Sequence, residues 1–197
     1  MTPTLTGRPG RPAACTREDA LNVAISRFLA CERVDVQAIA KDLGLARATM
    51  HRWFHTRDGL LGEAVGTLAV KRLLSHRSQT RGRGAKALVE CFHRYNSELV
   101  SSEPLRYLLA QEQDRALRIL TSSAATVQPL MVQTVKELLE AEIDAGKLVS
   151  PTDTGVLAYA IVRLSEAFLY NDAIAGIRGD IDRLREVQAA LLGLHET

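Results

Sequence analysis

The chain has 197 residues, of which 46% are hydrophobic, so it can form one ordinary domain or a small domain joined to a larger one. No apolar run approaches the ~18 residues of a membrane span and no charged-then-apolar leader opens the sequence, so we expect neither a membrane segment nor a signal peptide. The net charge of +2 divides unevenly: residues 1–89 hold 15 Lys and Arg against 7 Asp and Glu, and residues 90–197 hold 10 against 16. This asymmetry favours a chain that places its first part on a polyanion.

Residues 1–15 are rich in Gly, Pro and Arg and predict a flexible basic arm. The triplet Gly-Arg-Pro occurs twice in residues 7–12, around Arg8 and Arg11. Arginines on such an arm can enter the narrow minor groove of A·T-rich DNA, where the negative potential is concentrated. A disordered leader is the alternative, and the position of the arm immediately before the segments described next favours the DNA contact.

The first expected helix extends from Thr16 to about Cys31. Thr16 and Asp19 have the spacing of a capping box, in which each side chain accepts a hydrogen bond from the other residue's backbone. Leu21, Ala24 and Phe28 recur at helical spacing and predict the inward face.

Two short helices separated by a glycine turn fit residues 35–57. Asp35 is placed to cap the first helix, and Gly44 can adopt the left-handed conformation that the turn needs. The expected inward side chains are Val36, Ile39, Ala40 and Leu43 in the first helix, with Leu45, Met50 and Phe54 after the turn. Arg47, Thr49 and Arg52 are left on or near the outer face of the second helix. A helix-turn-helix with this outer face fits the major groove of DNA, where Arg binds guanine and Thr contacts a thymine methyl.

Residues 38–61, AIAKDLGLARATMHRWFHTRDGLL, resemble the DNA-binding motif of the TetR family of bacterial transcriptional regulators. Three positions depart from the family pattern: Ala46 replaces the usual Ser or Thr cap, His51 replaces Tyr, and Val36 replaces a frequent hydroxyl residue. We expect Gln37, Arg47 and Thr49 to contact base edges and Ala48 to contact a thymine methyl. We expect His51, Arg52 and Arg57 to contact phosphates.

The remainder of the sequence predicts helices only, because it shows no strand-like alternation and no tight hairpin turn. A fourth helix should begin at Asp58, and residues 75–84 predict a mobile loop. Further helices are expected over residues 85–99, from Pro104, over about 130–143, from a cap at Ser150 to about Ala175, and from Asp180. The fold class is therefore all-α. The expected domains are the arm (1–15), the helix-turn-helix domain (16–62), and an effector-binding and dimerisation domain (63–197).

The last two expected helices predict a homodimer. Nearly every face of residues 156–170 is apolar, with Arg163 and Glu166 the main exceptions, and a helix that is apolar all round is buried on more than one side. A thick monomeric core is the alternative. The resemblance implies the four-helix dimer interface of the TetR family, and two-fold symmetry then predicts half-sites about one helical turn apart on DNA.

The resemblance also implies a small-molecule pocket in the C-terminal helices. The candidate effector-binding residues are Phe92, Tyr95, Asn96, Phe168 and Asn171. The alternative is that each is a satisfied polar or apolar group of the core. The stretch EAEIDAGKLVSPTDT is similar to the QsdR-type regulators of lactone-signal degradation within the family, which implies a lactone or an acyl-chain compound as effector.

Other classes of function fit less well. There is no Gly-rich phosphate loop and no nucleophile motif, and His51 and His55 lack a third metal ligand, so we expect no enzyme, no metal and no cofactor. A protein with a purely structural role would not explain why Arg47, Thr49 and Arg52 are on or near the outer face of the second helix. Cys15, Cys31 and Cys91 are odd in number and far apart, which is typical of reduced thiols in the cytoplasm. We expect a repressor released by its effector; the alternative is an activator or a non-induced regulator of the same fold.

Overall fold

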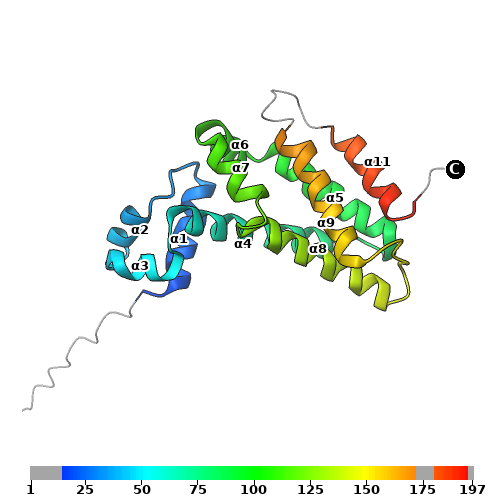
Figure 1. Cartoon of the computed structure of the whole chain (residues 1–197), viewed down its shortest axis with the longest axis horizontal. Coiled ribbons are helices and arrows are strands. Elements are labelled where there is room, and N and C mark those ends of the chain that lie inside the picture. The colour runs from blue at the N-terminus through cyan, green and yellow to red at the C-terminus, as the bar shows by residue number, and fades with distance from the viewer. Residues whose placement is uncertain (1–14, 172–179, 195–197) are drawn as a thin grey trace, which may run out of the picture.

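A computed structural model describes residues 15–171 and 180–194, with the side chain of Asn171 not included. These residues form ten α-helices and one π-helical turn and contain no strand, which confirms the all-α fold class (Figure 1). The elements are α1 (Arg17–Leu29), α2 (Val36–Asp42), α3 (Arg47–Phe54), α4 (Arg57–Gln79), α5 (Gly84–Ser101), α6 (Glu103–Gln111), α7 (Gln113–Thr121), α8 (Val127–Asp144), α9 (Thr154–Glu166), η1 (Ala167–Asn171) and α11 (Ile181–Leu191).

α1, α2 and α3 form a small three-helix unit at one end of the molecule (Figure 1). The predicted capping box opens α1: the backbone N–H of Thr16 donates to Asp19 Oδ2 at 2.7 Å, and the N–H of Asp19 donates to Thr16 Oγ1 at 3.1 Å. Six of the ten apolar side chains predicted to face inward are buried in its core: Ala24, Phe28, Ile39, Ala40, Met50 and Phe54. The other four, Leu21, Val36, Leu43 and Leu45, are partly buried and pack against that core.

The turn between α2 and α3 has the predicted geometry. Asp35 Oδ1 accepts hydrogen bonds from the backbone N–H groups of Gln37 and Ala38, both at 2.9 Å. Gly44 has a φ of +63°, in the left-handed region that a residue with a Cβ resists. Ala46 occupies the N-cap of α3 and gives it no side-chain hydrogen bond, so this end of α3 lacks the cap that Ser or Thr would supply.

α4 links the three-helix unit to the other helices, and the expected boundary at residue 62 falls within it (Figure 1). Thr56 caps it through a 2.9 Å bond from the N–H of Gly59. The prediction of a loop over residues 75–84 was wrong, because α4 continues to Gln79 and only residues 80–83 separate it from α5. Its C-terminal end is held in place by Arg77, which pairs with Glu142 of α8 at 2.7 Å.

The larger body consists of α4 and α5 packed with α8, α9 and α11, while α6 and α7 lie beside the end of α4 nearest the small unit (Figure 1). α9 packs on α8, and α11 packs on α5 and α9. Two expected boundaries differ in detail. The chain breaks between α6 and α7 at Glu112, which has an extended φ of −143°. Asp153 rather than Ser150 caps α9, because its Oδ1 accepts from the N–H of Val156 at 3.0 Å.

The expected continuation of α9 to about residue 175 reaches beyond the described residues. Up to that limit, α9 ends at Glu166 and the chain continues as the π-helical turn η1. No helix of the described residues combines the length and the apolarity needed to cross a bilayer.

Candidate functional site

The outer face of α3 is open to solvent. Arg47, Ala48, His51 and Arg52 are exposed and line a shallow hollow on this face, and Gln37 of α2 is exposed as well. Thr49 is half-buried. Inward packing of Met50 and Phe54 fixes this orientation, since those two side chains anchor the opposite side of the helix in the core. Arg8 and Arg11 precede the described residues.

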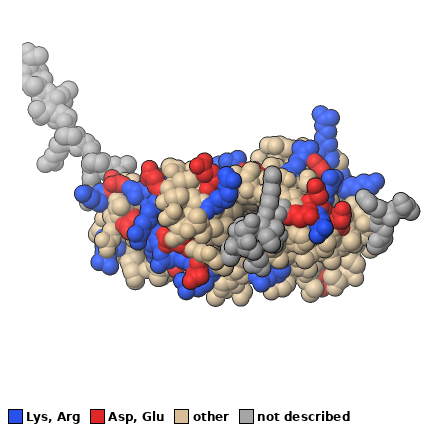
Figure 2. Space-filling model, turned by 90° about the horizontal axis from the view of Figure 1, so that it is seen from above, with Lys and Arg blue, Asp and Glu red and all other residues tan. Residues whose placement is uncertain are grey.

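Several basic side chains of the first part of the chain form ion pairs away from α3. Arg17 forms an ion pair with Glu63 at 2.5 Å, and Arg27 pairs with Asp42. The face shown in Figure 2 accordingly carries Lys and Arg together with Asp and Glu over both ends of the molecule. Arg47 and Arg52 form no ion pair with any described residue, so their charges remain available on the outer face of α3.

Arg57 does not lie on this face, which corrects its expected phosphate contact. Its Nε donates to the carbonyl oxygen of Val34 at 2.6 Å, and its two terminal nitrogens donate to the Glu112 carboxylate, each at 2.6 Å. The Arg57 guanidinium, together with Arg115, lowers the pKa of Glu112 to about 2. Arg57 therefore joins the small unit to the α6–α7 junction. Because Nε and both terminal nitrogens already donate hydrogen bonds, the guanidinium has no free pair of N–H groups for bidentate binding of a phosphate.

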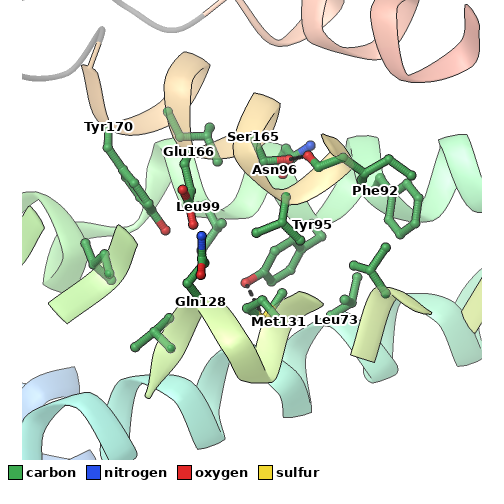
Figure 3. A pocket seen from close by; sticks show the side chains of 16 residues that line it. Leu73, Phe92, Tyr95, Asn96, Leu99, Gln128, Met131, Ser165, Glu166 and Tyr170 are labelled. Atoms are coloured by element: carbon green, nitrogen blue, oxygen red, sulfur yellow. Dashed lines mark hydrogen bonds between the residues drawn. The ribbon is translucent and has the colours of Figure 1, made fainter. Parts of the chain in front are cut away.

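A narrow cavity lies among α4, α5, α8 and α9 (Figure 3). We call it the inner chamber; its volume is about 40 Å³, and its lining includes Phe92, Tyr95, Asn96, Gln128, Glu166 and Tyr170. Three of the candidate effector residues therefore lie together. Phe168 does not line the chamber, which corrects its expected place: the residues of η1 that do so are Leu169 and Tyr170. A π-helical turn adds a residue to the turn and so changes which side chains face inward.

One side of the inner chamber is closed by a polar connection across three helices. Asn96, which is 1% exposed, donates from Nδ2 to Gln188 Oε1 of α11 at 3.4 Å. Gln188 in turn donates from Nε2 to Ser165 Oγ of α9 at 3.0 Å. Asn96 thus has a partner within the protein, as the alternative interpretation held, while it also lines the chamber.

The opposite side of the inner chamber presents three buried polar side chains with spare hydrogen-bonding groups. Gln128, Glu166 and Tyr170 are 4%, 8% and 8% exposed, and they point toward one another (Figure 3). Of these three side chains, only Glu166 forms a hydrogen bond with another described residue: its Oε2 accepts from Arg163 at 2.6 Å. Burial raises the pKa of Glu166 to about 7 although Arg163 opposes the shift, and burial also raises the pKa of Tyr170.

A second cavity adjoins the first. This outer chamber has a volume of about 300 Å³ and shares six lining residues with the inner chamber: Tyr95, Leu99, Leu120, Val127, Met131 and Tyr170. Beyond them its walls are mostly apolar and come from α1, α4, α5 and α6. Phe28 and Leu29 of α1 belong to this wall, so the outer chamber reaches the small three-helix unit.

Sequence reasoning missed Gln128 and Glu166 as cavity residues. Glu166 gave a signal, because it interrupts an otherwise apolar helix, and a buried carboxyl needs a partner or a proton. Gln128 gave none, since it stands at the start of α8 beside the exposed Leu130 and Pro129.

The model of the family described as "Tetracyclin repressor-like, C-terminal domain" matches residues 83–193, more than half of the chain. The chain belongs to the TetR family. It therefore has the fold of a helix-turn-helix, DNA-binding transcriptional regulator.

Solved structures agree with this membership of the TetR family. The R. erythropolis transcriptional repressor QsdR from the TetR family is 28% identical in sequence and superposes with a TM-score of 0.86, covering 92% of this chain and 96% of that one. The transcriptional regulator FadR from Bacillus subtilis, in complex with stearoyl-CoA, is 13% identical with a TM-score of 0.52, covering 92% of this chain and 100% of that one, and shows the fold alone. No curated protein matches the sequence.

Proposed function

We propose that this TetR-family chain is an effector-responsive repressor that binds operator DNA as a homodimer. In this proposal residues 16–62 bind DNA, residues 1–15 place Arg8 and Arg11 in the minor groove, and residues 63–197 bind the effector and dimerise. Gln37, Arg47 and Thr49 contact base edges, Ala48 contacts a thymine methyl, and His51 and Arg52 contact phosphates.

The observation that carries the proposal is the outer face of α3. Arg47 and Arg52 are exposed there without an ion pair among the described residues, whereas Arg17 and Arg27 of α1 are paired with Glu63 and Asp42. Two exposed guanidinium groups without a carboxylate partner among the described residues are free to bind a polyanion.

Dimerisation is supported by exposed apolar side chains on α9 and α11. Val156 and Tyr159 are 57% and 50% exposed, and Val187 of α11 is 39% exposed. Most of α9 falls in the segment 156–170, whose nearly uniform apolar character predicts burial on more than one side. A second copy related by a two-fold axis covers such a face with the same face of its own.

A repressor is favoured over an activator because the structure with 28% identity is that of a transcriptional repressor. The two adjoining chambers support a small-molecule effector, since ligand sites are concave, mostly apolar and carry a few convergent polar groups. A lactone or an acyl-chain compound is the effector class that the similarity to QsdR-type regulators favours.

Selection of duplexes from a random-sequence DNA pool tests the proposal. The wild-type chain should enrich one motif. Arg47→Ala should reduce the free energy of binding to that motif by about 1–3 kcal/mol and relax the preference at one base position. Arg52→Ala should weaken binding to all sequences about equally, and the salt dependence of binding should fall by the equivalent of about one phosphate contact. Arg106→Ala, which removes an exposed arginine of α6, is the matched control and should leave the profile unchanged.

Two results would overturn parts of this function. If no sequence is enriched by the wild-type chain, sequence-specific DNA binding is wrong. If Arg47→Ala enriches the same motif with the same preferences, Arg47 does not contact a base.

A further inference from the structure

We propose that the two chambers bind one uncharged amphiphile, with a small hydrogen-bonding head in the inner chamber and an apolar tail in the outer chamber against α1. This inference rests on the proposed function, because it names the chemical class of the effector and the route by which the effector reaches the DNA-binding unit.

The head is placed by the polar side of the inner chamber. Gln128 offers both an N–H donor and an oxygen acceptor, and no described residue satisfies either. The Tyr170 hydroxyl and the second Glu166 oxygen are also without a described partner. These groups face the chamber rather than a partner in the described residues, so a ligand group that both donates and accepts hydrogen bonds gains affinity there.

The size of the inner chamber limits the head to a few atoms. Its volume of about 40 Å³ compares with the roughly 10–15 Å³ that one water molecule needs on the same measure. A primary amide or a group of similar size fits this space, whereas a sugar or a nucleotide does not.

The charge of the head follows from its neighbours. An anionic head would lose its hydration shell in this buried chamber, and the nearby cation, Arg163, is already paired with Glu166 at 2.6 Å. A cationic head would also lose its hydration shell, and the Glu166 carboxyl that could pair with it already has Arg163 as its partner. An uncharged head avoids both costs.

The tail is placed by the outer chamber. Its walls include Val65, Leu68, Ala69, Pro104 and Leu105, and its charged residues, Arg72 and Glu98, form an ion pair with each other at 3.4 Å. The volume of about 300 Å³ is several times that of the inner chamber, so the larger part of the ligand is apolar.

The tail also gives the effector a direct contact with the DNA-binding unit. Leu29 and Phe28 lie at the C-terminal end of α1, and they line the outer chamber opposite residues of α4, α5 and α8. Atoms added between α1 and those helices favour a position of α1 that differs from the DNA-bound one. Such a ligand must bind the released state more tightly than the operator-bound state.

The binding test uses calorimetry of the full chain with hexanamide, decanamide, decanoate and decylammonium. Decanamide should bind roughly a hundredfold more tightly than hexanamide, because four more methylenes are buried. It should also bind at least tenfold more tightly than decanoate or decylammonium. Tighter binding of either charged probe, or no binding of any amide, would overturn the proposal.

The head is tested with Gln128→Leu, which should weaken decanamide binding about tenfold. Gln133→Leu is the matched control, because Gln133 is exposed on the same helix and lines neither chamber. Equal affinities of the two variants would show that the head does not bind at Gln128.

The tail is tested by release of the selected DNA motif. Decanamide should release it at saturation, and hexanamide should not. Leu29→Ser should raise the decanamide concentration needed for release at least fivefold, whereas Leu74→Ser should not, although Leu29 and Leu74 are both 45% exposed. Equal release by the two variants would overturn the contact with α1. DNA binding without any amphiphile is measured in parallel, so failure of the effector class is distinguishable from failure of the DNA-binding function.

Discussion

Glu166 is a carboxyl group in a place that favours its neutral form. It lies on α9 at 8% exposure, and burial raises its pKa to about 7 from an ordinary value of 4.5. Because the folded state holds the proton more tightly than the unfolded state does, Glu166 contributes most to stability below pH 4.5. That contribution is lost as the pH rises through about 7.

Glu166→Gln should therefore remove the destabilisation of the folded state that ionisation of this carboxyl causes at higher pH. The free energy of unfolding of the variant, relative to wild type, should rise by roughly 1–2 kcal/mol between pH 4.5 and pH 8, after allowance for solvent screening. Chemical denaturation at both pH values measures it. Glu186→Gln, at an exposed position of α11, is the control and should show no such change. A difference that does not vary with pH would show that Glu166 is ionised in the folded chain.

Roles that depend on local spacing can be predicted from the sequence, whereas roles that depend on contacts between residues distant in sequence cannot. The inward positions of Met50 and Phe54 follow from helical spacing, which is local, and the structure confirms them. The role of Arg57 depends on Glu112, which is 55 residues away along the chain, and no local pattern reports that pairing. Gln128 was missed for the same reason, because its cavity is formed by helices distant in sequence.

At the scale of elements, α3 and α4 meet at a point with no room for a side chain. A Cβ on Gly59 would lie 2.2 Å from the carbonyl oxygen of Phe54, at the C-terminal end of α3. At Gly62, one turn further along α4, the nearest atom would be 3.5 Å away, which is ordinary contact. The close approach at Gly59 fixes the angle at which α3 leaves the body of the molecule.

Gly59→Ala should destabilise the chain by about 1–3 kcal/mol, because backbone must shift to admit the methyl group. It should also weaken DNA binding by changing the direction of α3. Gly62→Ala is the matched control and should be neutral or stabilising by up to about 1 kcal/mol, since Ala favours helix over Gly. Thermal unfolding and binding to the selected motif measure both effects. Equal melting temperatures for the two variants would refute the close contact.

The junction between α4 and the α6–α7 break depends on Glu112. Its pKa of about 2 lies below the ordinary 4.5, so the stability it contributes is present above pH 4.5 and is lost as the pH falls toward 2. Glu112→Gln should lower the free energy of unfolding at pH 7 by about 1 kcal/mol, a modest value because the pair is partly exposed. The difference from wild type should shrink as the pH falls from 4.5 to 3 in denaturation experiments.

Glu137→Gln, on the exposed side of α8, serves as the control for this junction. A loss of stability at pH 7 that persists unchanged at pH 3 would mean that Glu112 acts through packing rather than through its charge. The break at Glu112 itself was not predicted, since residues 104–120 contain no Gly or internal Pro after Pro104 to mark it.

At the scale of the whole molecule, the apolar face of α9 and α11 is the feature that one chain leaves uncovered. Val156→Asp combined with Tyr159→Asp should convert the proposed dimer to monomers, because two charges per chain would be buried without partners. Sedimentation velocity measures the change. Val149→Asp is the control, since Val149 is 90% exposed in the segment before α9. A double variant that remains dimeric would place the interface elsewhere.

The all-α architecture and the family were predictable from the sequence because both depend on local patterns: the glycine turn, the capping residues and the apolar spacing. The cavity was predictable only as a property implied by the family. Its shape depends on how α1, α4, α5, α6, α8 and α9 pack, and on a π-helical turn that exchanges Phe168 for Leu169 and Tyr170.

Native mass spectrometry of the chain with its selected DNA motif, with and without decanamide, reports dimerisation, DNA binding and effector release together. Without decanamide, we expect a complex of two chains and one duplex. With decanamide at saturation, we expect free duplex and a DNA-free dimer carrying the small molecule. One chain per duplex, or a complex that holds the duplex and decanamide together at undiminished abundance, would show that the chain is not a dimeric repressor released by this effector.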